Sequence, residues 1–244
     1  MVHEYLFLPA VLVFAIIQSL FGMGILVFGT PTLLLLGYDF SMVLGLLLPS
    51  SVLISFTQAY TGRSLGRGER EAINMFVCAV LVVICLSALL LSDIKINLDL
   101  LIGLVMVFSA AVRLSERFRR FISRTLVTNQ HLFVLLMGAV HGLTNMGGAL
   151  LALYASSTQY EKTAIRTIVS RYYLMFGVIQ LGTLAILKPQ SLSILGFMTA
   201  PVALLVYWVI GNLLFRRTSA PVYEILLTAF IAVYGIVVLT KGYI

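Results

Sequence analysis

Apolar runs of about 20 residues recur along the chain, separated by short stretches that contain charged residues, glycine or proline. An α-helix rises about 1.5 Å per residue, so a run of this length matches the hydrocarbon thickness of a lipid bilayer. Inside a bilayer the backbone N–H and C=O groups must find partners within their own segment, which favours helices. The sequence therefore predicts an all-α polytopic membrane protein.

The composition agrees with this class. Of the 244 residues, 61% are hydrophobic and only 10% are charged, too few charges to cover the surface of a soluble domain. The net charge of +7 does not indicate a nucleic-acid partner, because Lys and Arg lie mainly in short loops, as the positive-inside rule describes. Cys78 and Cys85 share one apolar run and predict neither a disulfide framework nor a metal site.

Eight transmembrane segments are predicted from these runs. They cover residues 6–36, 41–60, 72–91, 98–114, 131–154, 164–187, 192–215 and 222–240. The first segment is too long for one straight helix. Gly22, Gly24, Gly29 and Pro31 lie within it, so we expect a broken helix or a re-entrant turn there.

The distribution of Lys and Arg predicts an orientation. If each segment crosses the membrane once, more basic residues fall on the side of the N-terminus than on the other side. The positive-inside rule then places both termini in the cytoplasm, in an inner (plasma) membrane. One re-entrant segment would change this assignment.

A basic stretch at residues 113–129 is expected to form an amphipathic helix at the membrane interface. Its arginines would bind lipid headgroups; they are Arg117, Arg119, Arg120 and Arg124. A regulatory protein-binding role is the alternative. The stretch divides the chain into an N-terminal transmembrane repeat (residues 1–112) and a C-terminal transmembrane repeat (residues 130–244).

The two halves resemble each other weakly, and polar residues match polar residues when one half is shifted by 122 or 123 positions onto the other. The matched pairs are Gln18 with His141, Gly22 with Asn145, Gly24 with Gly147, and Gln58 with Gln180. Internal duplication with interrupted helices in corresponding places is a sequence pointer to the solute site of a transporter.

The fifth segment contains polar residues followed by glycines: His141, Thr144, Asn145, Gly147 and Gly148. Polar side chains within an apolar run face the protein interior or a water-filled cavity. The glycines would let the backbone open and leave N–H groups at a positive helix end, which can hold an anion. The alternative is that small residues only permit close helix packing.

Polar stripes follow these breaks in both halves. They consist of Ser51, Ser55 and Gln58 in the second segment, and of Ser170, Tyr173, Gly177 and Gln180 in the sixth. Hydrogen bonds between helices would explain such stripes without any solute. The match of Gln58 with Gln180 favours two sides of one cavity instead.

Arg171 is expected about seven residues inside the sixth segment. It either snorkels to the interface or is a fixed cation near the solute path, suited to bidentate binding of sulfite, sulfonate or carboxylate. Lys162 and Arg166, just upstream, would attract anions or are simply loop charges. All nine Asp and Glu residues lie in loops or near segment ends, which argues against a cation carrier.

The sequence contains no motif of an enzyme or a nucleotide site, such as His-Glu-x-x-His, Gly-x-Ser-x-Gly, a P-loop or a dinucleotide fingerprint. We therefore predict no catalytic activity, no cofactor and no direct coupling to ATP. If transport is coupled to protons, His141 is the candidate within a segment.

The chain resembles the sulfite exporter TauE/SafE family of membrane transporters. The resemblance depends on length, on the two halves, and on a glycine-rich break in each: Phe21-Gly-Met-Gly24 and Asn145-Met-Gly-Gly148. In the family a run ending near proline usually follows, as in Thr30-Pro31, whereas the second copy has Leu153-Tyr154. The helix after the break often carries a basic residue, here Arg171. The resemblance implies passage of sulfite or organosulfur compounds such as sulfoacetate through a bacterial-type inner membrane.

The combined prediction is a transporter that holds a small anion between its two repeats and moves it by alternating access. The expected solute-binding residues are Gln18, Gly22, Gly24, Ser51, Ser55, Gln58, His141, Thr144, Asn145, Gly147, Gly148, Arg171 and Gln180. A passive anion channel, or a receptor or assembly subunit that transports nothing, remains the alternative. The sequence leaves open whether the chain forms a homo-oligomer.

Overall fold

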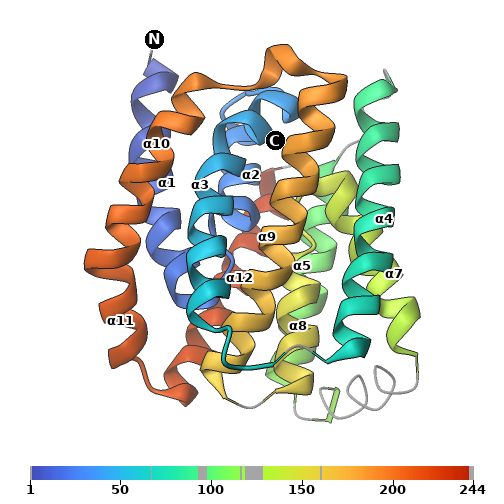
Figure 1. Cartoon of the computed structure of the whole chain (residues 1–244), viewed down its shortest axis with the longest axis vertical. Helices are drawn as coiled ribbons and strands as arrows, with labels where there is room; N and C mark the ends of the chain where they lie inside the picture. Colours follow the sequence, from blue (N-terminus) through green and yellow to red (C-terminus); the bar gives the residue numbers. More distant parts are fainter. Residues whose placement is uncertain are drawn as a thin grey trace.

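The computed structural model describes residues 2–66, 68–92, 98–115, 117–118, 129–159 and 161–241. Every regular element in these ranges is helical, and the helices form one bundle with roughly parallel axes (Figure 1). Five are long and apolar enough to cross a membrane: α3 (Phe40–Thr61), α4 (Glu69–Leu91), α9 (Lys162–Leu187), the continuous run Ile194–Arg217, and α12 (Ala220–Lys241). The predicted all-α polytopic class is confirmed.

The remaining helices complete the bundle. The run Ile194–Arg217 consists of α10 (Ile194–Val206), the π-helical turn η2 (Tyr207–Gly211) and α11 (Asn212–Arg217), and a 3-10 turn, η1 (Pro189–Ser191), precedes it. The shorter helix α5 (Leu98–Leu114) packs along α12. Gly211 in η2 lies directly against Ser19, and a β-carbon there would overlap that side chain. The small residue thus lets η2 approach the first helix closely.

The first segment is a helical hairpin. α1 (Val2–Phe21) and α2 (Ile25–Leu35) run in opposite directions, and the rings of Phe14 and Phe28 lie 6.4 Å apart across them. The chain reverses at Gly22, whose φ of 77° favours glycine. A β-carbon at Gly22 would also come within 2.8 Å of the Arg166 carbonyl oxygen. The re-entrant turn expected from the glycines is therefore present.

The fifth segment forms a second hairpin from α7 (Gln130–Thr144) and α8 (Gly148–Thr158). Its turn contains Asn145 in the left-handed conformation, with a φ of 61°. The start of α7 meets the later part of α8, because Gln130 Nε2 donates to the Tyr154 hydroxyl at 2.6 Å. We call residues 22–24 the first tip and residues 145–147 the second tip.

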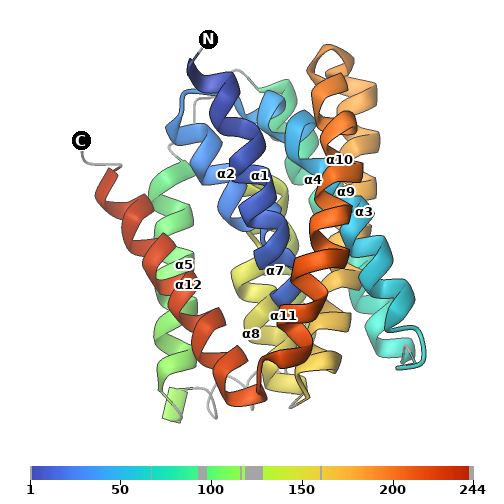
Figure 2. The same ribbon diagram turned by 90° about the vertical axis from the view of Figure 1, so that its left-hand side faces the viewer.

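The two hairpins enter the bundle from opposite ends, as the paths of α1–α2 and α7–α8 show (Figures 1 and 2). They meet inside, where Asn145 Nδ2 donates to Thr30 Oγ1 at 2.8 Å. Each hairpin packs against helices of the other half: α1 lies on α10 and η2, and α7 lies on α4. Two further pairs join the halves, α3 with α9 and α5 with α12. Each hairpin is thus held mainly by the opposite half of the chain.

The predicted count of eight crossings is not confirmed. Residues 6–36 and 131–154 each fold back within the bundle, so the loops between these two hairpins lie at the opposite ends from those that a simple count assigns. α1 begins and α12 ends at the same end of the molecule (Figure 2). The opposite end, which we call the basic end, carries Arg63, Arg70, Arg113, Arg117, Lys162, Arg166, Arg171, Arg216 and Arg217, whereas Lys188 and Lys241 lie where α1 begins.

Arg113, at the predicted start of the interfacial linker, lies in the last turn of α5, where its buried guanidinium pairs with the partly exposed Glu224 carboxylate of α12. It also donates to the Ser156 hydroxyl at 2.8 Å, so it joins α5 and α12 to α8. Arg117 is exposed. The other predicted lipid contacts, Arg119, Arg120 and Arg124, lie outside the described residues.

Candidate functional site

Gln18 organises the first tip. Its Nε2 donates to the Ser51 carbonyl oxygen at 3.0 Å and to the Ser55 hydroxyl at 3.1 Å. Its Oε1 accepts the N–H of Ile25, the first residue of α2, at 3.1 Å. One buried amide therefore joins α1 to α3 and caps the start of α2, a position where helix N–H groups lack partners of their own.

The C-terminal carbonyls of α1 also receive side-chain donors. Gln58 Nε2 donates to the Gln18 carbonyl oxygen at 2.9 Å and to that of Ser19 at 3.3 Å. Arg166 Nη1 donates to the Ser19 carbonyl oxygen at 3.1 Å. A cation is favourable at this position because a helix carries partial negative charge at its C-terminus. The interrupted helix is thereby stabilised inside the bundle.

Arg166, which the sequence left open as an anion-attracting residue or a loop charge, is the charged residue of this site. Its guanidinium lies 3.4 Å from the centroid of the Phe215 ring, and only 9% of the residue is exposed. Among the described residues, no carboxylate lies within ion-pair distance of it. Its spacing in the sequence could have assigned it to the site, because Arg166 begins the stripe that continues through Ser170, Tyr173 and Gly177 at helical intervals.

His141 is the central polar residue of the second tip. Its ring is fully buried, stacks on Phe176 with the centroids 3.8 Å apart and meets the Tyr173 ring edge-on at 5.8 Å. Gln180 lies beside it. Among the described residues, neither the imidazole nitrogens nor the Gln180 side-chain amide has a partner at ordinary hydrogen-bond geometry. Burying polar groups without partners is unfavourable.

The Tyr173 hydroxyl lies against Gly148, the first residue of α8. A β-carbon at Gly148 would overlap both this hydroxyl and the Val27 side chain, so only glycine permits the contact. Within the described ranges, neither this hydroxyl nor Asn145 Oδ1 has a hydrogen-bond partner. We call His141, Asn145, Tyr173 and Gln180 the tip cluster.

Thr144 and Gly147 shape the turn rather than face the cluster. Thr144 Oγ1 accepts the Met146 N–H at 3.1 Å and donates to the Val140 carbonyl oxygen at 2.7 Å. Gly147 lies against the His141 side chain, where a β-carbon would be 2.7 Å from the His141 β-carbon. Similarly, a β-carbon at Gly24 would overlap the backbone of Gln18, so both glycines allow the chain to fold back.

The two halves differ in how their matched polar groups are satisfied. In the first half Gln18 and Ser51 bond to each other, and the Gln58 amide nitrogen has partners, although its Oε1 has none. In the second half the residues at the positions that correspond to Gln18, Ser51 and Gln58 are His141, Tyr173 and Gln180. Their polar side-chain atoms have no hydrogen-bond partner among the residues that the structure describes. Unsatisfied buried groups in a native fold require an explanation, and a bound ligand is one.

Arg171 is not brought to either tip. Its guanidinium pairs with the Glu71 carboxylate at 3.3 Å and donates to the carbonyl oxygens of Gly62, Leu65 and Gly66 in the α3–α4 loop. The other predicted site residues gather at the two tips. Within the described ranges, His, Cys, Asp and Glu side chains form no group of three that could hold a metal ion.

A helical membrane bundle with two opposed re-entrant hairpins, matched between the halves of the chain and carrying buried polar groups at their tips, has the architecture of a transporter. Residues 7–238 match the family described as Sulfite exporter TauE/SafE. The chain belongs to this family of membrane transporters, which are not enzymes. The resemblance inferred from the glycine breaks is confirmed. Searches of curated proteins and of solved structures found no match.

Proposed function

We propose that this transporter carries a small oxyanion, sulfite or an organosulfur compound such as sulfoacetate, and that the tip cluster binds it. The observation that carries the proposal is the set of buried polar atoms on His141, Asn145, Tyr173 and Gln180 that lack a hydrogen-bond partner among the described residues. A solute whose oxygens accept hydrogen bonds from the Tyr173 hydroxyl, the Gln180 amide and the imidazole would satisfy them together.

The surrounding backbone favours a negative charge. The Tyr173 hydroxyl lies at the N-terminus of α8, where N–H groups without helical partners and the helix dipole attract anions. Asn145 can contribute as well. Rotating its amide by 180° would let Oδ1 accept from the Thr30 hydroxyl and would turn the Nδ2 donor towards the solute.

Arg166 supports the choice of an anion over a neutral solute. It is a buried cation on the polar stripe of α9, two turns before Tyr173, and it lacks a carboxylate partner among the described residues. Its charge raises the electrostatic potential along the path from the basic end to the tip cluster. We assign to Arg166 the role of fixed cation that the sequence suggested for Arg171.

Movement of the solute would require the two hairpins to separate on one side at a time. Polar contact between them includes the hydrogen bond from Asn145 to Thr30, and Val27 packs on Gly148 nearby. Neither contact involves a buried charge, so the hairpins can part with little electrostatic penalty. We propose alternating access, in which one half rocks against the other around this contact.

Sulfite flux into liposomes tests the proposal. Liposomes with the purified protein should take up sulfite along its gradient, with a rate that saturates, whereas empty liposomes should not. Sulfoacetate should compete if it shares the site. A rate that rises linearly with concentration would favour a passive channel. Absence of flux for both solutes would favour a receptor or assembly subunit.

The positions of the basic residues lead us to propose an orientation opposite to the one derived from eight crossings. Because the basic end lies opposite the start of α1, the positive-inside rule places the basic end in the cytoplasm and both termini outside it. In a variant without Cys78 and Cys85, Gln190→Cys should react with an impermeant maleimide in intact spheroplasts. Ser219→Cys should react only after permeabilisation, and the reverse result would restore the first orientation.

A further inference from the structure

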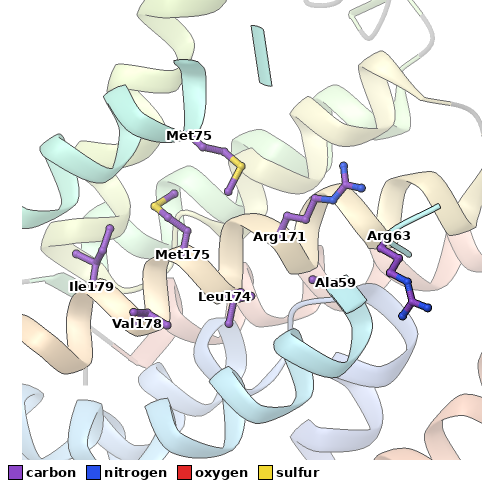
Figure 3. Close-up of a pocket in the computed structure, with 8 residues that line it drawn as sticks. All are labelled: Ala59, Arg63, Met75, Arg171, Leu174, Met175, Val178 and Ile179. Carbon is purple, nitrogen blue, oxygen red and sulfur yellow. The ribbon is translucent and has the colours of Figure 1, made fainter. Parts of the chain in front are cut away.

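A cavity of about 620 Å³ lies between α3, α4 and α9, and none of its lining residues belongs to the tip cluster. Its walls are apolar over most of their length and include Met75, Leu174, Val178 and Ile179, while Arg63 and Arg171 lie at one end. In Figure 3 Arg63 and Arg171 lie on one side of the methionine, valine and isoleucine side chains, with their guanidinium groups pointing in different directions. We call this cavity the α3–α4–α9 groove.

We propose that the groove binds an anionic phospholipid, with one acyl chain along the apolar walls and the phosphate at Arg63 and Arg171. The direction of the groove fits this ligand. Along α9, Ile179 is eight residues beyond Arg171, which is about 12 Å of helix. The apolar walls therefore extend from the basic end towards the middle of the bundle, as a lipid tail extends from its headgroup.

The walls face the surroundings of the bundle rather than its core. Val178 is 54% exposed, and in a membrane such a surface contacts hydrocarbon. A small hydrophilic anion gains little from walls of Met75, Leu174 and Ile179, whereas an acyl chain is stabilised by them. None of the groove residues belongs to the tip cluster, so the lipid site does not depend on the proposed function.

The charges at the end of the groove suit a phosphate. Arg171 is paired with Glu71 at 3.3 Å. Arg63 stacks over the Tyr60 ring at 4.0 Å, and no described carboxylate lies within ion-pair distance of it. Arg63, Arg171 and Glu71 together leave one net positive charge. Basic pockets between transmembrane helices on the cytoplasmic side bind anionic headgroups in this way.

Native mass spectrometry of the delipidated protein tests this site, with phosphatidylglycerol and phosphatidylcholine of identical acyl chains as probes. The wild type should retain phosphatidylglycerol preferentially. Arg63→Gln should weaken its retention about fivefold, the effect of one arginine near a lipid phosphate, and leave phosphatidylcholine unchanged. Arg217→Gln removes the same charge from the same end of the bundle outside the groove, and should change neither.

Val178→Trp tests the acyl-chain half of the site. The indole would fill the groove from an exposed position, so the fold should persist while retention of both lipids falls. The proposal is overturned if Arg63→Gln and Arg217→Gln weaken phosphatidylglycerol equally, since that indicates surface charge alone. It is also overturned if Val178→Trp leaves lipid retention unchanged, or if it abolishes a protein dimer, which would assign the groove to a second copy of the chain.

Discussion

Replacing Tyr173 with Phe should raise the sulfite concentration at half-maximal uptake roughly ten- to hundredfold. A hydrogen bond to a charged group contributes about 1.5–3 kcal/mol, and each 1.4 kcal/mol is about tenfold in affinity. The ring would keep its edge contact with His141, so the change removes one donor at the start of α8 and little else. The measurement is the concentration dependence of uptake into liposomes.

The same substitution should leave thermal stability unchanged or slightly higher. The Tyr173 hydroxyl is buried and has no hydrogen-bond partner in the part of the chain that the structure describes, and such a group destabilises the fold. If the hydroxyl binds the solute, its removal is therefore expected to lower the affinity for sulfite without lowering the thermal stability. If the hydroxyl serves packing alone, its removal would not lower the affinity for sulfite.

Tyr172→Phe is the matched control. Tyr172 is the neighbouring residue, is equally buried, and packs edge-on against Tyr154 with the centroids 6.1 Å apart. It is not part of the tip cluster, so its hydroxyl should not affect sulfite uptake. If both variants weaken uptake alike, or if Tyr173→Phe has the wild-type concentration dependence, the tip cluster does not bind sulfite through Tyr173.

The sequence predicted the breaks, whereas the hydrogen bonds of the first tip correspond to the alternative that it left open for the polar stripe, because polar groups in an apolar chain have few possible partners. Gln18, Ser51, Ser55 and Gln58 lie on neighbouring helices in surroundings without water, so bonding to each other is the favourable solution. The Gly22 turn was predictable for a related reason, since a reversal inside the bundle requires a residue that tolerates positive φ.

The sequence could not distinguish a broken helix that continues from one that returns, because both leave the same glycines and the same apolar length. Because of that ambiguity, the sequence placed the loops between the two hairpins at the wrong ends, and the orientation that we propose differs from the one it predicted. It also explains the assignment of Arg171. The α3–α4 loop, which supplies Glu71 and three carbonyl partners for Arg171, is near α9 only in the folded bundle.

Arg166 appeared to be a loop charge because it is only four residues from the start of α9. Its burial depends on η2 and α11, which lie on the other side of it and supply Phe215. Tyr173 was part of the predicted stripe, but its role depends on the contact with Gly148. The burial of Arg166 and the role of Tyr173 thus depend on contacts between segments that are far apart in the sequence, which a local sequence pattern does not reveal.

Replacing Arg166 with Gln should have two separable effects. The variant loses the charge-assisted bond to Ser19 and the contact with Phe215, so the free energy of unfolding should fall by about 2–4 kcal/mol. Sulfite uptake per folded molecule should also fall, because a fixed positive charge on the anion path is lost. Thermal unfolding in detergent measures the first effect, and uptake normalised to folded protein measures the second.

Arg166→Lys separates the charge from the shape of the side chain. Lysine keeps the positive charge but cannot stack a planar guanidinium on Phe215, so it should lose part of the stability and keep most of the sulfite uptake. Arg216→Gln, which removes a nearby exposed charge on α11, should leave both properties close to wild type. If folded Arg166→Gln protein transports sulfite at the wild-type rate, Arg166 only caps α1, and the preference for anions must come from the N-terminus of α8 and the tip cluster alone.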